Sequence, residues 1–253
     1  MASAPAKQAT PKIASPAEWL AARKELLAKE KELTHLRDSL AAQRREMPWL
    51  RIEKDYTFDT PKGKQSLSEL FDGHSQLIVY HFMLGPESEA GCPSCSLLAD
   101  SLNPLRVHVE QRDVNLILIS RAPLAKIETF QKRMGWTLPW ASSYATDFNF
   151  DFGVSFDEDK IATGEKNYNY GSMSFTTGEA PGLSVFAKNA DGSIFHSYST
   201  YARGLDPLVG VYQLLDLTPK GRNEDGLPWP MAWVRHHDRY DQPSPVQIQP
   251  AKS

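Results

Sequence analysis

The sequence predicts an α/β protein built on a parallel strand–helix–strand unit. Two mostly apolar runs, residues 77–82 and 114–119, have the length and composition of strands covered on both faces. A helical pattern lies between them at residues 96–113 and breaks at Pro104. Parallel neighbours need such a crossover connection, so this order predicts a parallel βαβ core.

A long helix is expected ahead of this core. Ser15, Pro16 and Glu18 form the pattern of a capping box with proline in the first turn, and Pro48 ends the segment, so we expect a helix over residues 16–47. Large apolar residues recur at helical spacing among many charges, at Trp19, Leu20, Leu26, Leu27, Leu33, Leu36 and Leu40. This amphipathic pattern favours packing on the same domain or on a second copy, so a homodimer through this helix is possible.

The remaining elements follow in order. Tyr56 and Phe58 alternate with polar residues before a turn at 61–63, which predicts a hairpin. A helix is expected from Leu124 to Gly135, where glycine ends it. Further segments are a strand at 183–186, a turn at 189–192, a returning strand at 193–200 and a closing helix at 205–218. Phe148, Phe150 and Phe152 alternate like a strand face.

The ends of the chain and one internal segment lack such patterns. Residues 1–14 and 241–253 are predicted to be disordered tails. Residues 157–179 are polar and without periodicity, and they lead directly into Pro181. This segment is either a lid or substrate wall, with Tyr168, Tyr170 and residues 172–175, or a mobile solvent loop.

Composition excludes several classes of function. The net charge of −3 offers no cationic field for nucleic acid or anionic lipid. No apolar run approaches the ~18 residues of a membrane span, and the first residues lack the apolar core of a secretory signal. A cytoplasmic protein that binds neither nucleic acid nor membrane is therefore expected.

Both cysteines fall in one motif, Gly91-Cys92-Pro93-Ser94-Cys95, between the first apolar strand and the following helix. At this spacing on a first helical turn the two sulfurs come within disulfide distance. The unpaired backbone N–H groups and the positive end of the helix dipole favour the thiolate of Cys92. Cys92 is thus the expected nucleophile and Cys95 the resolving thiol.

The same motif also fits a metal site or a purely structural role. A closed zinc site needs two more ligands, and the seven histidines show no zinc-ligand spacing, so no metal is expected. The cysteines could instead be two inert buried residues. A redox pair is favoured because it also accounts for the strand-to-helix position, and it requires no cofactor.

Longer motifs resemble a known family. LFDGHSQLIVYHFMLGPESEAGCPSCSLLAD, VNLILISRAP, MGWTLPWASS, FNFDFGVSF and WPMAWVRHHDRY are similar to the bacterial "domain of unknown function 899" family of the thioredoxin-like superfamily. The resemblance implies a single thioredoxin-like, peroxiredoxin-type domain over residues 15–240, with a central mixed sheet flanked by helices, a long N-terminal helix and a C-terminal extension.

The thioredoxin plan also implies roles for residues outside the motif. It places a cis bond between Ala180 and Pro181, beside Cys92, with a backbone that pairs with an incoming peptide. Gly91 stands where a thioredoxin has tryptophan. The predicted substrate-binding residues are Pro181, Ala180, Pro93, Ser94, Arg121, Tyr168 and Tyr170, with Arg121 a candidate activating arginine.

The function expected from these features is thiol–disulfide oxidoreductase activity. Its partners would be a thiol or disulfide substrate and a reducing dithiol. The alternatives are a thiol peroxidase acting through Cys92 and a non-catalytic binding protein that uses the same cleft.

Overall fold

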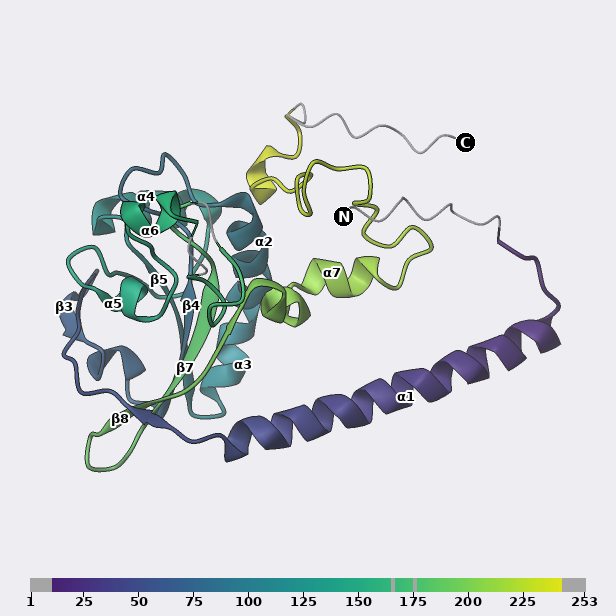
Figure 1. Cartoon of the computed structure of the whole chain (residues 1–253), viewed down its shortest axis with the longest axis horizontal. Helices are drawn as coiled ribbons and strands as arrows, with labels where there is room; N and C mark the ends of the chain where they lie inside the picture. Colours follow the sequence, from purple (N-terminus) through teal and green to yellow (C-terminus); the bar gives the residue numbers. More distant parts are fainter. Residues whose placement is uncertain (1–10, 165–166, 175–176, 243–253) are drawn as a thin grey trace. The chain divides into compact units, whose positions relative to one another are not determined.

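The structure is a computed structural model that describes residues 11–164, 167–174 and 177–242 (Figure 1). The predicted tails lie largely outside these residues. The chain divides into two compact units, Met1–Pro48 and Trp49–Ser253, which are described separately.

The first unit is dominated by helix α1, Pro16–Glu46. The predicted capping box is present, since the Ser15 N–H donates to the Glu18 carboxylate at 2.9 Å and the Glu18 N–H donates to Ser15 Oγ at 3.4 Å. These bonds satisfy backbone donors that have no partner inside the helix. No residue of α1 is buried, and its seven large apolar side chains are 40% to 62% exposed.

The second unit is built on one mixed sheet. In the described residues the strand order is β1-β8-β7-β4-β5-β6-β2-β3. The strands are β1 (Leu50–Arg51), β2 (Thr57–Thr60), β3 (Gly63–Ser66), β4 (Gln76–His81), β5 (Val114–Ser120), β6 (Trp140–Ser142), β7 (Gly182–Lys188) and β8 (Ile194–Tyr201).

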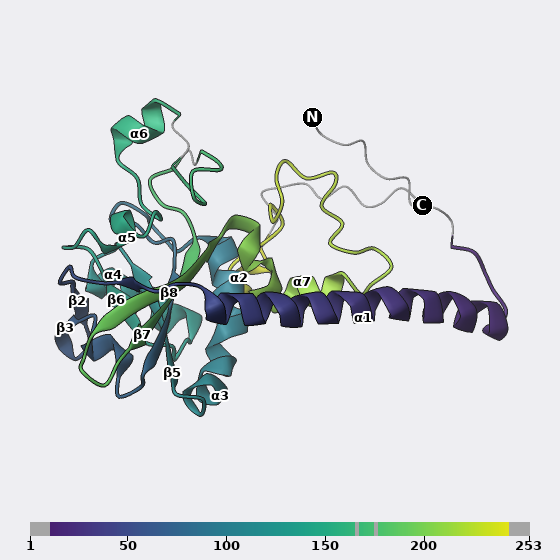
Figure 2. The ribbon, with the colours of Figure 1, turned by 60° about the horizontal axis from the view of Figure 1, so that its bottom comes forward.

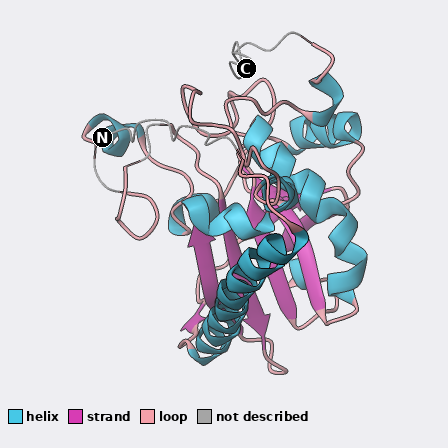
Figure 3. Ribbon diagram, turned by 90° about the vertical axis from the view of Figure 1, so that its right-hand side faces the viewer, coloured by secondary structure: helices cyan, strands magenta, loops and turns pink. Residues whose placement is uncertain are grey.

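The helices of this unit follow β4, β5, β6 and β8 in the chain and lie around the sheet, as Figure 3 shows. They are α2 (Pro93–Leu102), α3 (Arg106–Glu110), α4 (Leu124–Met134), α5 (Phe148–Asp151), α6 (Glu158–Ala162) and α7 (Gly210–Leu215). The predicted break at Pro104 is confirmed as a 3₁₀ turn between α2 and α3. The predicted end of α4 is confirmed at Gly135, whose φ of 64° is the left-handed conformation that glycine adopts at little cost.

The centre of the sheet has the thioredoxin plan. β4 and β5 are parallel neighbours joined through α2, which confirms the predicted βαβ core. β7 runs antiparallel to both β4 and β8. The resulting order β8-β7-β4-β5, with helices after β4, β5 and β8, is that of a thioredoxin-like fold.

Each face of the sheet has its own core, because successive strand residues point to opposite faces. Tyr80, Leu116 and Leu118 face one way and pack with apolar residues of α2, α4 and α7. Leu77 and Val79 face the other way, among the aromatic side chains of β2 and α5. Tyr80 therefore points toward the helix that carries both cysteines.

Two predicted elements differ from the structure. The expected strand at Phe148, Phe150 and Phe152 is wrong, since these residues form and follow the short helix α5. Phe148 and Phe152, four positions apart, share the buried side of this turn, whereas Phe150 stacks on Arg121. The closing helix is shorter than expected, because a 3₁₀ segment containing Pro207 precedes α7.

Candidate redox site

Cys92 is the N-cap residue of α2, at the position expected from the motif. Its N–H donates to the Met83 carbonyl at 3.0 Å, which ties the start of the helix to the chain leaving β4. Its own carbonyl accepts from the Ser96 N–H at 2.9 Å, the first bond of the helix. Pro93 follows at the first helical position, where no N–H is needed.

The two thiols are free and unequal in environment. Cys95 is 2% exposed, whereas Cys92 is partly buried. The Cys95 thiol donates to Cys92 and lowers the Cys92 pKa to about 6, aided by the backbone N–H groups of Cys95 and Ser94 and opposed by burial. Burial raises the pKa of Cys95 instead. Only Cys92 is thus prepared to be a thiolate at neutral pH.

Tyr80 is a member of this site that the sequence did not reveal. Its side chain is 1% exposed, and its hydroxyl is hydrogen-bonded to Cys95. Burial raises the pKa of Tyr80, so the phenol stays a neutral donor. One signal was available: Tyr80 is a polar-tipped residue on the face of β4 that the following helix covers.

Gly91 is required by packing. A Cβ at this position would lie 2.6 Å from the Phe82 ring and 2.7 Å from the Phe130 ring, closer than carbon atoms approach. No side chain, tryptophan included, fits there without displacing these rings. In this chain the rings of Phe82 and Phe130 therefore leave room only for glycine at position 91.

His236 reaches this motif from the C-terminal extension. Its Nε2 donates to the Gly91 carbonyl at 2.7 Å, and its ring packs edge-on against Phe130. Arg133 donates to the other ring nitrogen at 2.9 Å, which fixes the neutral tautomer. Burial lowers the pKa of His236. No pattern in the sequence indicated that this histidine would contact Gly91.

The segment that carries His236 is anchored on both sides. Arg133 of α4 binds Asp238 with two hydrogen bonds, of 2.9 and 2.8 Å, and His237 contacts Asp100 of α2 at 2.7 Å. Upstream, one oxygen of Glu224 accepts from the Tyr212 hydroxyl, the Met231 N–H and the Trp233 indole. These contacts hold the extension against α4 and against α2, the helix that begins at the cysteine motif.

Pro181 lies at the start of β7, one position before Gly182, which pairs with His81 at the end of β4. The bond between Ala180 and Pro181 is trans, so the cis bond expected from the thioredoxin plan is wrong. For X–Pro bonds the trans form is the more stable by about 0.5–1 kcal/mol. Here two hydrogen bonds to neighbouring residues are compatible with the trans form. The Ala180 N–H donates to Val154 at 2.9 Å, and the Pro181 carbonyl accepts from the Tyr168 hydroxyl.

The two predicted tyrosines lie in different surroundings. Tyr168 is 1% exposed, and its pKa is raised by burial and in part by Cys95, which places it near the thiols. Tyr170 is 74% exposed and donates to the Ser199 carbonyl at 2.9 Å. Figure 2 shows α6, which precedes these tyrosines, projecting from the sheet. Phe175, which was also expected in this wall, lies outside the described residues.

Arg121 has partners other than the cysteines. Its guanidinium pairs with Glu179 at 3.1 Å and stacks on the Phe150 ring at 4.4 Å. Glu179 also accepts from Ser155 at 3.2 Å, and burial raises its pKa to about 6. This largely buried ion pair joins the end of β5 to the segment before Pro181.

Most of the chain matches one family of known proteins. The model of a family described as "Bacterial protein of unknown function (DUF899)" matches residues 8–240. The chain belongs to this family. No curated protein matches the sequence.

Several solved structures similar to this DUF899 chain are named as peroxiredoxins in their titles. Peroxidoxin BcpB from Mycobacterium tuberculosis is 14% identical, with a TM-score of 0.42 over 67% of this chain and 96% of its own. A yeast mitochondrial 1-Cys peroxiredoxin is 19% identical, with a TM-score of 0.38 over 66% of this chain and 75% of its own. No residue role in the DUF899 chain follows from these values.

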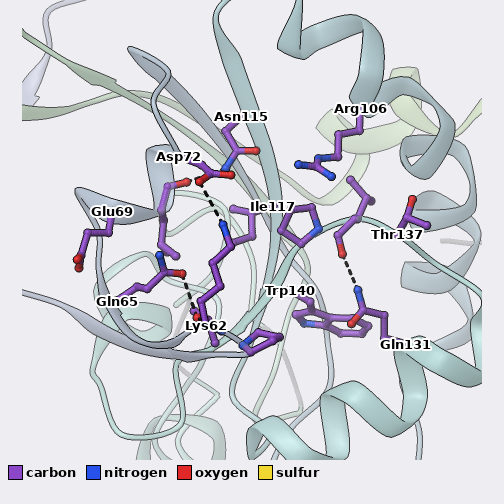
Figure 4. A pocket seen from close by; sticks show the side chains of 15 residues that line it. Lys62, Gln65, Glu69, Asp72, Arg106, Asn115, Ile117, Gln131, Thr137 and Trp140 are labelled. Atoms are coloured by element: carbon purple, nitrogen blue, oxygen red, sulfur yellow. Dashed lines mark hydrogen bonds and ion pairs between the residues drawn. The ribbon is translucent and has the colours of Figure 1, made fainter.

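A separate cavity of about 280 Å³ lies in this DUF899 protein between the β2–β3 hairpin, α3 and the start of β5, with no cysteine in its wall. Figure 4 shows Arg106 and Asn115 pointing toward one another in it. Asn115 is 2% exposed and donates to the Leu70 carbonyl at 2.7 Å. No sequence pattern indicated this cavity.

Two further properties concern metals and membranes. Among the described residues, no group of three or more histidine, cysteine or acidic side chains is placed to hold a metal ion. Within the same residues, no helix has the length and apolar character needed to cross a bilayer.

Proposed function

We propose that this protein is a thiol–disulfide oxidoreductase whose redox centre is the pair Cys92 and Cys95. One observation carries the proposal: a partly buried thiol at the N-cap of α2 accepts a hydrogen bond from a buried thiol one turn later. In this arrangement Cys92 is the attacking sulfur and Cys95 is the resolving sulfur. We further propose that the reaction takes place in the cytoplasm, where reducing dithiols can restore the pair.

The reaction proceeds by two exchanges. The Cys92 thiolate attacks one sulfur of a disulfide RSSR, forms a mixed disulfide and releases RS⁻, which takes up a proton. Cys95 then loses its proton and attacks Cys92, which closes the intramolecular disulfide and releases the second thiol. Two electrons pass to the substrate, and the reverse sequence restores the dithiol. The Tyr80 hydroxyl can donate to the Cys95 thiolate as it forms.

Equilibration with a glutathione redox buffer tests this proposal. The thiol content, measured by alkylation and mass, should follow a reversible two-electron transition that Cys92→Ser and Cys95→Ser each abolish. Alkylation of the reduced protein should label Cys92 first. Two thiols that react only when the protein unfolds would overturn the proposal and favour a non-catalytic binding protein.

Peroxide reduction at Cys92 is a second candidate, because a thiol with a lowered pKa also attacks peroxides. The geometry favours it less, since the candidate activating guanidinium of Arg121 is paired with Glu179. Peroxide consumption by the native protein and by Cys92→Ser, measured with a reductant in excess, separates the two reactions. Rapid turnover that depends on Cys92 would favour the peroxidase.

A further inference from the structure

We infer that the Cys92–Cys95 couple exchanges with low-molecular-weight thiols and disulfides rather than with disulfides of folded or unfolded proteins. The inference rests on the proposed function and names its substrate class. It is carried by the hydrogen bonds of the two backbone segments that flank the cysteines.

When the substrate disulfide belongs to a protein, the polypeptide on either side of the substrate cysteine must be bound beside Cys92. An extended peptide gains that place by hydrogen-bonding to free backbone groups, as in the addition of a strand to an exposed edge. The segments able to offer such groups here are residues 180–181, before β7, and residues 91–92, before α2. A peptide can dock only where these groups lack internal partners, because replacing an existing bond gains little.

Two of the three polar backbone groups of the strand-side segment already have internal partners. The Ala180 N–H is bonded to the Val154 carbonyl, and Pro181 has no N–H. The Pro181 carbonyl accepts from Tyr168, whose hydroxyl also accepts from the Ala202 N–H at 2.8 Å. The Tyr168 side chain is 1% exposed, so this bond is sheltered from water and not readily exchanged for one to a peptide.

Three of the four polar backbone groups of the helix-side segment have internal partners as well, since the Cys92 carbonyl accepts from Ser96. The Cys92 N–H is bonded to Met83, and the Gly91 carbonyl accepts from His236. His236 is itself held by Arg133, and the neighbouring His237 is held by Asp100. The C-terminal extension thus takes the position that a partner backbone would use beside the nucleophile.

Cys92 nevertheless keeps partial exposure, and its neighbour Pro93 is exposed. A small disulfide needs only an approach along the sulfur–sulfur axis and no backbone partner. Its reaction is the balanced exchange already given, in which the dithiol and RSSR yield the intramolecular disulfide and two RSH. Reduction of the protein consumes two molecules of a small thiol and releases RSSR.

Stopped-flow measurement with two probes tests the inference. The reduced full-length protein is mixed with hydroxyethyl disulfide or with insulin. The reactivity of the Cys92 thiolate itself is measured separately, as its rate of alkylation by iodoacetamide. We expect hydroxyethyl disulfide to react at least about tenfold faster per disulfide, because seating the insulin chain beside Cys92 requires one internal backbone hydrogen bond to break. Equal rates, or a faster reaction with insulin, would overturn this inference and leave the proposed function intact. No reaction with either probe would overturn both.

Variants test whether the occupied backbone groups are the cause. Tyr168→Phe frees the Pro181 carbonyl, and His236→Ala frees the Gly91 carbonyl. Each should raise the ratio of the insulin rate to the hydroxyethyl disulfide rate, by roughly tenfold for one good backbone bond. His74→Ala is the matched control, because His74 is hydrogen-bonded to a backbone carbonyl, that of Phe71, at the opposite end of β4 from the motif. Ratios that match the control in both variants would show that the occupied backbone groups do not set the preference.

Discussion

His236 donates a hydrogen bond to the carbonyl oxygen of Gly91 at 2.7 Å, although the two residues lie 145 positions apart in the chain. The contact joins the C-terminal extension to the residue that precedes the nucleophile. On its other side Gly91 meets the rings of Phe82 and Phe130. The backbone before Cys92 is therefore fixed from two directions, which holds the thiol at the start of α2.

Replacement of Gly91 by alanine should destabilise the protein. The new Cβ would lie within 2.8 Å of ring atoms of Phe82 and Phe130, both of which are buried. Overpacking of this kind costs about 1–3 kcal/mol. Chemical denaturation should show this loss in the free energy of unfolding of Gly91→Ala.

Gly226→Ala is the matched control for this substitution. A Cβ at Gly226 would meet no atom within 4 Å, so the expected change is within about 0.5 kcal/mol. Similar stabilities for the two variants would show that the rings near Gly91 yield without cost.

The lowered pKa of Cys92 should depend on the hydrogen bond from Cys95. Cys95→Ala removes the donor, so the pKa of Cys92 should rise from about 6 toward the ordinary value of about 8.5. Cys95→Ser keeps a hydroxyl donor and should raise the pKa less. The rate of iodoacetamide labelling as a function of pH measures both values. Labelling of Cys95→Ala at pH 6 should slow by roughly tenfold or more, whereas unchanged profiles would assign the lowered pKa to the helix terminus alone.

The elements of the fold could be predicted where one local signal decides them. The capping box of α1, the glycine at the end of α4 and the apolar run of β5 each fix an element within a few residues. The strand predicted at Phe148–Phe152 was wrong because apolar residues that alternate over five positions also fit one turn of a helix. The choice between a strand and a helical turn depends on the side to which each ring packs. That side is set by Phe58 and Phe186, which lie far away in the sequence.

The candidate site was predictable only in part, for a similar reason. Cys92 and Cys95 share one turn of helix, so their spacing already defines their relation. Tyr80, Tyr168 and His236 reach the site from a strand, a long connection and the C-terminal extension, and no local pattern brings these together. The trans bond at Pro181 likewise follows from partners such as Val154 and Tyr168.

The ion pair of Arg121 and Glu179 should make stability depend on pH. The Glu179 side chain is 14% exposed, and burial raises its pKa to about 6 while Arg121 opposes this rise. Arg121→Met removes the opposing charge, so the pKa of Glu179 should rise further. A carboxyl with a raised native pKa contributes stability below its unfolded pKa of about 4.5 and loses it as pH rises through the native value.

The loss in Arg121→Met should therefore be small at pH 5 and larger at pH 8. Each added unit of pKa corresponds to about 1.4 kcal/mol at the higher pH. Denaturation of the wild type and the variant at both values measures the difference. In the double variant Arg121→Met, Glu179→Gln the pH-dependent part should disappear. A loss of equal size at pH 5 and pH 8 in the single variant would contradict the proposed coupling.

Helix α1 should associate with a second copy of itself. Trp19, Leu26, Leu33 and Leu40 are spaced seven residues apart, the repeat that keeps one stripe of a helix facing its partner in a coiled coil. None of these side chains is buried in the single chain. Sedimentation equilibrium should show a dimer that Leu26→Glu, Leu33→Glu converts to monomer. The control is the double variant Lys24→Glu, Lys31→Glu, which also introduces two glutamates. Each lies two positions before one of the leucines and outside the apolar stripe. A wild-type protein that stays monomeric at micromolar concentration would rule out this use of the helix.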